Sequence, residues 1–147
     1  MNKQKICIIG GGLTGLITAI SLSRHNCKID LVTGNIKENH KNKGTVAISE
    51  NNLDYIDKLN ISKSLKKIAW PCSIMELYSE NKSKKFSKIL ELNNNKKIKK
   101  ILYMVQNSQI NKIMINKIKK INCISIKKSG TVSKIFNSGL LKGVRLN

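Results

Sequence analysis

Residues 5–33 read KICIIGGGLTGLITAISLSRHNCKIDLVT, and this stretch decides the fold. The apolar run ICII leads into Gly10, Gly12 and Gly15, which have the spacing G-x-G-x-x-G. An apolar helical segment follows, and a second β-like run covers residues 29–32. A strand, a glycine turn, a helix and a parallel strand within about 30 residues are the fingerprint of a dinucleotide-binding unit. The sequence therefore predicts an α/β fold of the Rossmann type.

Each of the three glycines has its own expected role in holding a diphosphate. Gly10 allows the tight turn out of the strand, Gly12 lets a phosphate approach the backbone, and Gly15 lets the helix pack closely on the strand. The N-terminus of the helix offers free N–H groups and the positive end of its dipole. The predicted phosphate-binding loop consists of Gly10, Gly11, Gly12, Leu13, Thr14 and Gly15.

A targeting segment is the alternative interpretation of the same stretch. Residues 6–23 contain no charged side chain, and their length approaches that of a membrane-spanning helix. Four glycines crowd the first half, however, and no small-x-small cleavage site follows. The flanking strands favour dinucleotide binding.

The net charge of +20 raises the question of an anionic partner. The basic residues concentrate in residues 81–147, which contain 17 of them and a single acidic residue, Glu91. This asymmetry is typical of a basic module that binds nucleic acid or an anionic membrane. Nucleic acid is disfavoured because six aromatic residues in the whole chain give little surface for base stacking. Lys, Asn and Ile also share A/T-rich codons, so base bias alone could produce this composition.

The remaining composition argues against metal or nucleophilic chemistry. The four cysteines are widely spaced, and only two histidines are present, so no metal site is predicted. Cys7 is expected to be a small buried hydrophobe in the first strand. Reduced cysteines and the lack of a secretion signal favour a cytoplasmic protein. No arrangement of acidic, histidine or serine residues identifies a catalytic group.

The rest of the chain alternates between helical and β-like patterns. Ser49 is a good N-cap for a helix over residues 50–59, and a second helix is predicted over 107–121. Trp70-Pro71 is expected to break the pattern after a short helical turn. Strands are predicted over residues 72–79, 86–92, 101–105, 123–126, 131–136 and 140–146, with a polar turn or loop at 93–100.

Together these segments resemble the FAD-dependent aromatic-ring hydroxylases, and within them the branch that acts in ubiquinone biosynthesis. The resemblance rests on IIGGGLTGLITAISLSR, GTVAISENNLDYIDKLNI, WPCSIMELY and YMVQNSQINKIMINKI. It implies a Rossmann-like FAD-binding domain formed by residues 1–70 and 106–147. Strands of the substrate-side sheet, residues 71–105, are inserted into it. The later Asp-Gly and Gly-Asp motifs of the family are absent from this sequence, which is therefore expected to be C-terminally truncated.

The resemblance also assigns cofactor-binding residues. The glycine loop is expected to hold the FAD diphosphate, and Gln106 lies in the region that approaches the cofactor. Thr33 occupies the position of the ribose-binding acid and can offer a hydroxyl without a charge. The family arginine falls on Gly44 here, and the adjacent Lys43 is its expected substitute.

The activity that the resemblance implies is the hydroxylation of an aromatic or prenylated quinone precursor by FAD, with NADH or NADPH as electron donor. This chain is expected to be the N-terminal, FAD-binding part of such a monooxygenase and inactive alone, at the periphery of the inner membrane or in the cytoplasm. Two alternatives stay open. One is the basic module without enzymatic activity, and the other is a Rossmann protein that binds NAD(P).

Overall fold

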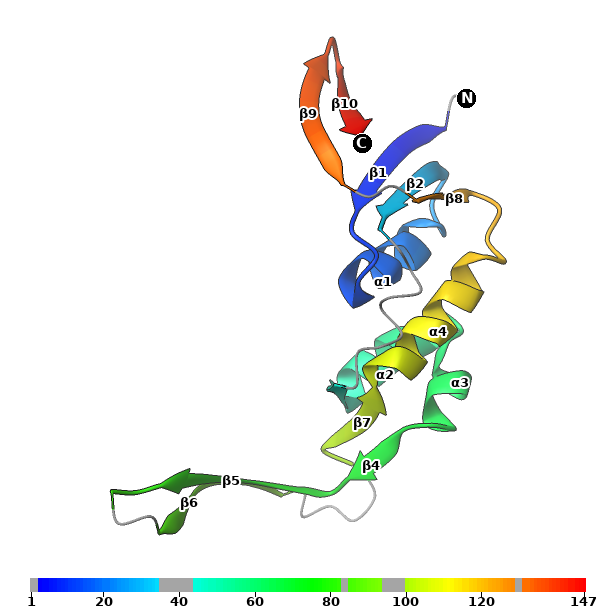
Figure 1. Cartoon of the computed structure of the whole chain (residues 1–147). Helices are drawn as coiled ribbons and strands as arrows, with labels where there is room; N and C mark the ends of the chain where they lie inside the picture. The colour runs from blue at the N-terminus through cyan, green and yellow to red at the C-terminus, as the bar shows by residue number, and fades with distance from the viewer. Residues whose placement is uncertain (1–2, 35–43, 83–84, 94–99, 129–130) are drawn as a thin grey trace. The chain divides into compact units, whose positions relative to one another are not determined.

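The computed structural model describes residues 3–34, 44–82, 85–93, 100–128 and 131–147. The chain forms two compact units (Figure 1). The first unit combines Met1–Gly44 with Asn107–Asn147, and the second unit is Thr45–Gln106. Residues 35–43, which include Lys43, and most of the predicted turn at 93–100 lie outside the described residues. The assignment of residues to a cofactor domain and a substrate domain stays a prediction.

The first unit contains the predicted strand–helix–strand arrangement. Strand β1 (Gln4–Ile9) is followed by helix α1 (Leu13–Leu22) and strand β2 (Cys27–Thr33). Strand β8 (Ile124–Lys128) joins them much later in the chain. The three strands are parallel and lie in the order β1-β2-β8. The α/β fold with a parallel sheet at its start is thus confirmed.

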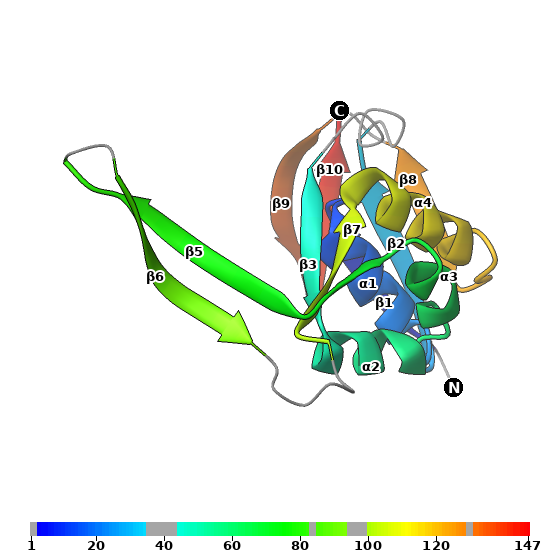
Figure 2. The same cartoon turned by 90° about the horizontal axis from the view of Figure 1, so that it is seen from below.

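Helix α4 (Asn107–Ile118) packs against α1 on one side of this sheet (Figures 1 and 2). The helix ends three residues before the predicted limit, because the N–H groups of Lys120 and Ile121 donate to carbonyls only three residues back. Such tighter bonds are common in the last turn of a helix. The core of the unit is formed by the buried side chains of Leu16, Ala19, Ile20, Ile29, Leu31, Ile110, Met114 and Ile118.

The opposite face of the sheet is less covered, which corrects one expectation. Cys7 is exposed rather than buried. Side chains alternate between the faces of a strand, so Ile6 and Ile8 share the α1 face and Cys7 points to the other side. Partial desolvation, and then the negative charge of Asp30, raise the pKa of the Cys7 thiol. The sequence pattern of β1 could not show that no helix within the described residues covers its second face.

The second unit is built on an antiparallel sheet with the strand order β3-β7-β4. Two helices complete it, and their apolar residues Leu53, Ile56 and Leu65 are buried. The helical pattern ends before Trp70-Pro71, as expected, and these residues form part of a short edge strand, a position that tolerates proline. The elements are β3 (Thr45–Ser49), α2 (Glu50–Lys58), α3 (Ser62–Lys66), β4 (Trp70–Cys72) and β7 (Leu102–Gln106).

Local signals explain where α2 begins and ends. The Ser49 hydroxyl accepts a hydrogen bond from the N–H of Asn52 at 3.3 Å, which confirms the predicted N-cap. After the helix, Asn60 has a φ of 57°, a left-handed conformation that asparagine adopts more readily than most residues. The N–H of Ile61 then donates to the carbonyl of Ile56 at 3.3 Å and closes the end of the helix.

A two-stranded ribbon extends from the second unit (Figure 2). It pairs β5 (Ile74–Glu80) with β6 (Phe86–Asn93) in antiparallel register; the sequence predicts both strands but not their pairing. One face carries four apolar side chains that are 41–47% exposed: Met75, Leu77, Leu90 and Leu92. The other face carries the Glu76 and Glu91 carboxylates, both paired with Lys88. Ile74, Tyr78 and Phe86 lie on this second face and are also exposed, so only the first face is uniformly apolar.

The chain finishes with a second hairpin. It pairs β9 (Val132–Ser138) with β10 (Leu141–Leu146), and Gly139 makes the turn with a φ of 59°. The Phe136 ring covers Gly143, where an added Cβ would lie 2.3 Å from the ring. Within the described part of the chain, no helix has the length and apolar character needed to cross a membrane.

Candidate cofactor-binding site

The candidate site is the turn between β1 and α1. Gly10 has a φ of +121°, a conformation that side chains rarely adopt, and this lets the chain reverse immediately after Ile9. The Gly10 N–H donates to the carbonyl of Val32 at 2.8 Å, which ties the turn to the end of β2. The start of α1 is therefore fixed at the carboxyl ends of the two parallel strands. This edge of an open α/β sheet is where such folds bind their ligands.

Two glycines lie too close to other atoms of the protein to carry a side chain. A Cβ on Gly15 would lie 2.0 Å from the carbonyl oxygen of Gly10. A Cβ on Gly11 would lie 1.9 Å from the Oγ1 of Thr33. Both distances are far below van der Waals contact, so these positions accept only glycine without a shift of the backbone. The expected packing role of Gly15 thus has a direct geometric basis.

Gly12 differs because its missing side chain leaves open space. It is the N-cap of α1, and a Cβ built there would meet no atom within 4 Å. No side chain caps the helix, and the first turn contains no acidic residue. By the geometry of an α-helix, the first N–H groups of α1 have no acceptor within the helix. Open space, unpaired donors and a positive dipole end suit an anionic group, so the residues present fit a diphosphate.

Thr33 lies beside this turn, at the end of β2. Thr33 is 5% exposed. Its Oγ1 would lie 1.9 Å from a Cβ added to Gly11, so its hydroxyl packs directly against this glycine. An acidic side chain would be larger and charged in this buried position, whereas threonine fits closely. Thr33 is therefore next to the predicted phosphate-binding loop, and its role toward a ribose stays a prediction.

The described structure does not test the other two residues of the predicted site. Gln106 is exposed at the end of β7 in the second unit and pairs with Thr45. Lys43 lies outside the described residues. Gly44, at the family's arginine position, is exposed, and its carbonyl accepts a hydrogen bond from the N–H of Asn107 at 2.9 Å. The roles of Lys43 and Gln106 stay predictions.

The structure adds a residue that sequence reasoning missed. Val32 holds the turn through its backbone carbonyl, as described above. Any residue could supply this carbonyl, so the identity of Val32 carried no signal. The need for glycine at position 11 was likewise invisible, because it arises from contact with a residue 22 positions later in the chain.

Comparison with known proteins concerns the chain as a whole. Residues 3–135 match the family model described as "FAD binding domain". This match covers most of the chain, including the glycine turn and both units. A comparison with curated proteins finds no match to this chain.

Solved structures share the fold at low sequence identity. p-Nitrophenol 4-monooxygenase PnpA from Pseudomonas putida has a TM-score of 0.67 and 13% identity, over 92% of this chain and 34% of its own. CtdE, solved in complex with FAD, has a TM-score of 0.69 and 18% identity, over 99% and 35%. PqsL, described as a probable FAD-dependent monooxygenase from Pseudomonas aeruginosa, has a TM-score of 0.73 and 13% identity, over 99% and 39%. The chain thus spans little more than a third of the length of these proteins.

Proposed function

We propose that this chain, which belongs to the FAD binding domain family, provides the FAD-binding part of a flavin-dependent monooxygenase. The observation that carries the proposal is the open space at Gly12, in front of the unpaired N–H groups of α1. FAD is the cofactor of the family, and its diphosphate matches the charge and donor pattern of this turn. The similarity in fold to monooxygenases supports the reaction class.

In this proposal the chain binds and positions the cofactor. The glycine turn and the first N–H groups of α1 hold the diphosphate, and the Thr33 hydroxyl faces the adjoining ribose. When bound, FAD supplies the redox chemistry that activates oxygen, and the protein orients and shields it. The described residues suggest no general base. We therefore assign this chain a binding role and leave the substrate-binding groups to the rest of a complete enzyme.

We further propose an aromatic quinone precursor as the substrate, with NADH or NADPH as electron donor. The support is the resemblance of three segments to the ubiquinone-biosynthesis branch. These segments form β3 with α2, β4 with most of β5, and most of β7 with α4. The Thr45–Gln106 unit would contribute strands to the substrate side. A complete enzyme carrying this chain should hydroxylate a prenylated phenol in a flavin-dependent assay, and activity on non-aromatic substrates alone would exclude this substrate class.

Flavin binding can be tested on residues 1–147 directly. We expect FAD to bind in a saturable manner, measured by quenching of flavin fluorescence, and at least tenfold more tightly than NADH or NADPH. Gly12→Ala should weaken FAD binding because its methyl group fills the open space. Tighter binding of NADH or NADPH than of FAD would favour the alternative Rossmann protein. Absence of saturable FAD binding would show that the chain needs the family's later motifs to hold the cofactor.

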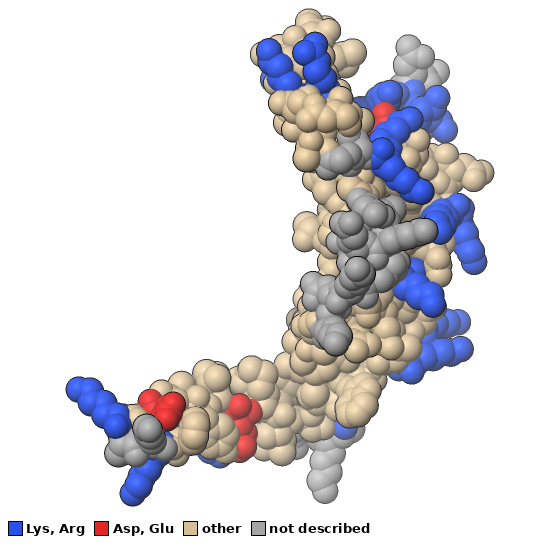
Figure 3. Space-filling model, viewed as in Figure 1, with Lys and Arg blue, Asp and Glu red and all other residues tan. Residues whose placement is uncertain are grey.

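The charge distribution favours a second role, in attraction to an anionic membrane. Lysine and arginine side chains gather over the part of the first unit that carries α4 and β8 (Figure 3). Exposed members of this group include Lys112, Lys119, Lys120, Lys127 and Lys128. A surface of this kind should bind vesicles containing anionic lipid and release them as salt increases. Cosedimentation with anionic and neutral vesicles tests this, and equal binding to both would exclude it.

A further inference from the structure

The first unit has a lysine-lined cavity at the edge of the sheet opposite the glycine turn. A cavity of about 460 Å³ opens where β1, β2 and β8 begin. Three lysines line it, Lys3, Lys5 and Lys28, together with one acidic residue, Asp30. The glycine turn instead follows the end of β1, and five residues of strand, about 16 Å, separate Lys5 from Gly10.

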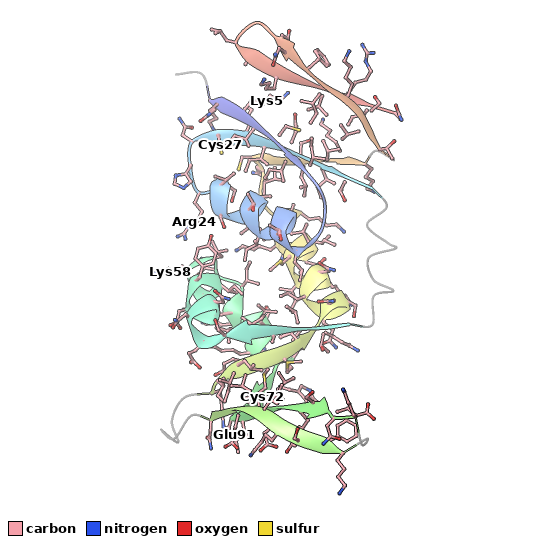
Figure 4. The ribbon with its side chains drawn as sticks, turned by 90° about the vertical axis from the view of Figure 1, so that its left-hand side faces the viewer. Lys5, Arg24, Cys27, Lys58, Cys72 and Glu91 are labelled. Atoms are coloured by element: carbon pink, nitrogen blue, oxygen red, sulfur yellow. The ribbon has the colours of Figure 1, made fainter. Side chains whose placement is uncertain are left out.

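The register of the sheet forces two of these lysines together. Lys5 and Lys28 are direct partners in the parallel pairing of β1 with β2. Partner side chains point to the same face, and neighbouring strands are about 4.8 Å apart. Figure 4 labels Lys5 on β1 on the face away from α1, and Cys27, next to Lys28 in sequence, on the opposite face of β2. Like charges placed side by side on a sheet cost stability unless a counter-charge relieves them.

Asp30 neutralises only part of this charge. Its carboxylate lies 3.1 Å from the Nζ of Lys5, and Asp30 is the one acidic residue lining the cavity. Lys3 and Lys28 have no counter-ion among the described residues, which leaves a formal charge of +2 at the cavity. The Asn122 amide and the Ser125 hydroxyl add neutral hydrogen-bond donors to the lining.

From this arrangement we propose that the cavity binds the phosphate group of a small metabolite. A phosphate monoester carries close to two negative charges near neutral pH, which matches the uncompensated lysines. It also has three acceptor oxygens within one compact group, and lysine and hydroxyl donors can converge on them. The site is distinct from the diphosphate loop because it lies at the other end of the strands.

The test uses the whole chain in the Gly12→Ala background, so that the glycine turn does not contribute. Inorganic phosphate is titrated by calorimetry at constant ionic strength, with chloride as the compensating ion. We expect Lys28→Gln to weaken phosphate binding about fivefold and Lys28→Arg to change it less than threefold. Lys112→Gln, which removes the same charge from the exposed face of α4, should change it less than twofold. Asp30→Asn should tighten phosphate binding, because it removes the ion pair with Lys5 and leaves the Lys5 ammonium available to the phosphate.

Each alternative gives a different result. Equal losses for Lys28→Gln and Lys112→Gln would show attraction by net charge alone and would overturn the site. Binding of succinate as tight as that of phosphate would assign the cavity to dicarboxylates and overturn the phosphate class. Lys28→Gln should also leave the free energy of unfolding unchanged or higher, since it removes a like-charge pair. A large loss of stability would show that Lys28 is structural.

Discussion

Two alanine substitutions three residues apart should separate the folding role of the glycine turn from its binding role. Gly15→Ala places a methyl group 2.0 Å from the backbone oxygen of Gly10. That atom belongs to the turn itself and cannot rotate away. Gly12→Ala places the same group where no atom lies within 4 Å, on a backbone with φ −75° and ψ 177° that alanine adopts freely.

The expected effects on stability follow from these distances. In Gly15→Ala, the distance between the new Cβ and the Gly10 carbonyl oxygen must lengthen by roughly 1 Å or more. Such overpacking costs about 1–3 kcal/mol of stability. Alanine recovers about 0.5–1 kcal/mol of this as a better helix former. We expect a net loss of about 1.5 kcal/mol for Gly15→Ala, or about tenfold in the folding equilibrium. In Gly12→Ala, alanine is a poorer N-cap, which destabilises the fold, but it also reduces the entropy of the unfolded chain, which stabilises it. These two effects should cancel to within about 0.5 kcal/mol of unfolding free energy.

For FAD binding, the order of the two variants is reversed: Gly12→Ala should have the larger effect. Hydrogen bonds from N–H groups to a charged phosphate contribute about 1.5–3 kcal/mol each. A methyl group at Gly12 that keeps the phosphate from one such donor should weaken FAD binding about 10- to 100-fold. Gly15 does not face this space, so the folded fraction of Gly15→Ala should retain most of its affinity.

Urea unfolding followed by circular dichroism gives the free energy of unfolding, and flavin fluorescence gives the affinity. Both variants are measured at a temperature where the unmodified chain is fully folded. If Gly12→Ala destabilises the chain as much as Gly15→Ala, then the space at Gly12 is not open. If it binds FAD as tightly as the unmodified chain, then the diphosphate does not lie at the N-terminus of α1. Either result refutes the reasoning.

Two further predictions concern the β5–β6 ribbon. We expect the exposed apolar face that contains Leu77 and Leu90 to drive self-association, measured by sedimentation velocity, and Leu77→Lys combined with Leu90→Lys to reduce it. Glu80→Lys on the other face is the matched control and should have little effect. Hydrogen bonds from Lys88 hold the pKa of Glu76 below its ordinary value of 4.5, so the stabilising contribution of Glu76 is complete above that pH and is lost as the pH falls through the lowered pKa. Amide exchange of the ribbon between pH 3 and 6 should show this change, and Glu76→Gln should abolish it.

Local sequence was sufficient for much of the secondary structure. The glycine spacing defined the β1-α1-β2 unit, and Ser49 with its following apolar residues defined α2. These signals lie within one turn or one helix of the residues they organise, so they can be recognised without knowing what packs on them. The amphipathic pattern of α4 was predicted for the same reason, apart from its last turn.

Properties that depend on a distant partner were not predictable in this way. Cys7 lies in an apolar strand of a kind that usually belongs to a core, yet its side chain is exposed. Trp70-Pro71 follows the end of the helical pattern as expected, but its pairing with β7 in an edge strand was not predicted. In both cases the outcome depends on which other elements cover or pair with the strand, and no local pattern records that.

The sequence by itself determined that this chain starts with a dinucleotide-binding turn, because the required backbone shape restricts the residue types within a few positions. Only the tertiary structure decided which atoms a side chain at each of three glycines would meet. Gly12 opens to space, Gly15 touches the turn itself, and Gly11 touches Thr33. Likewise, only the parallel register brings Lys5 beside Lys28. Spacing along the chain fixes local geometry, whereas contacts between strands depend on how the whole sheet assembles.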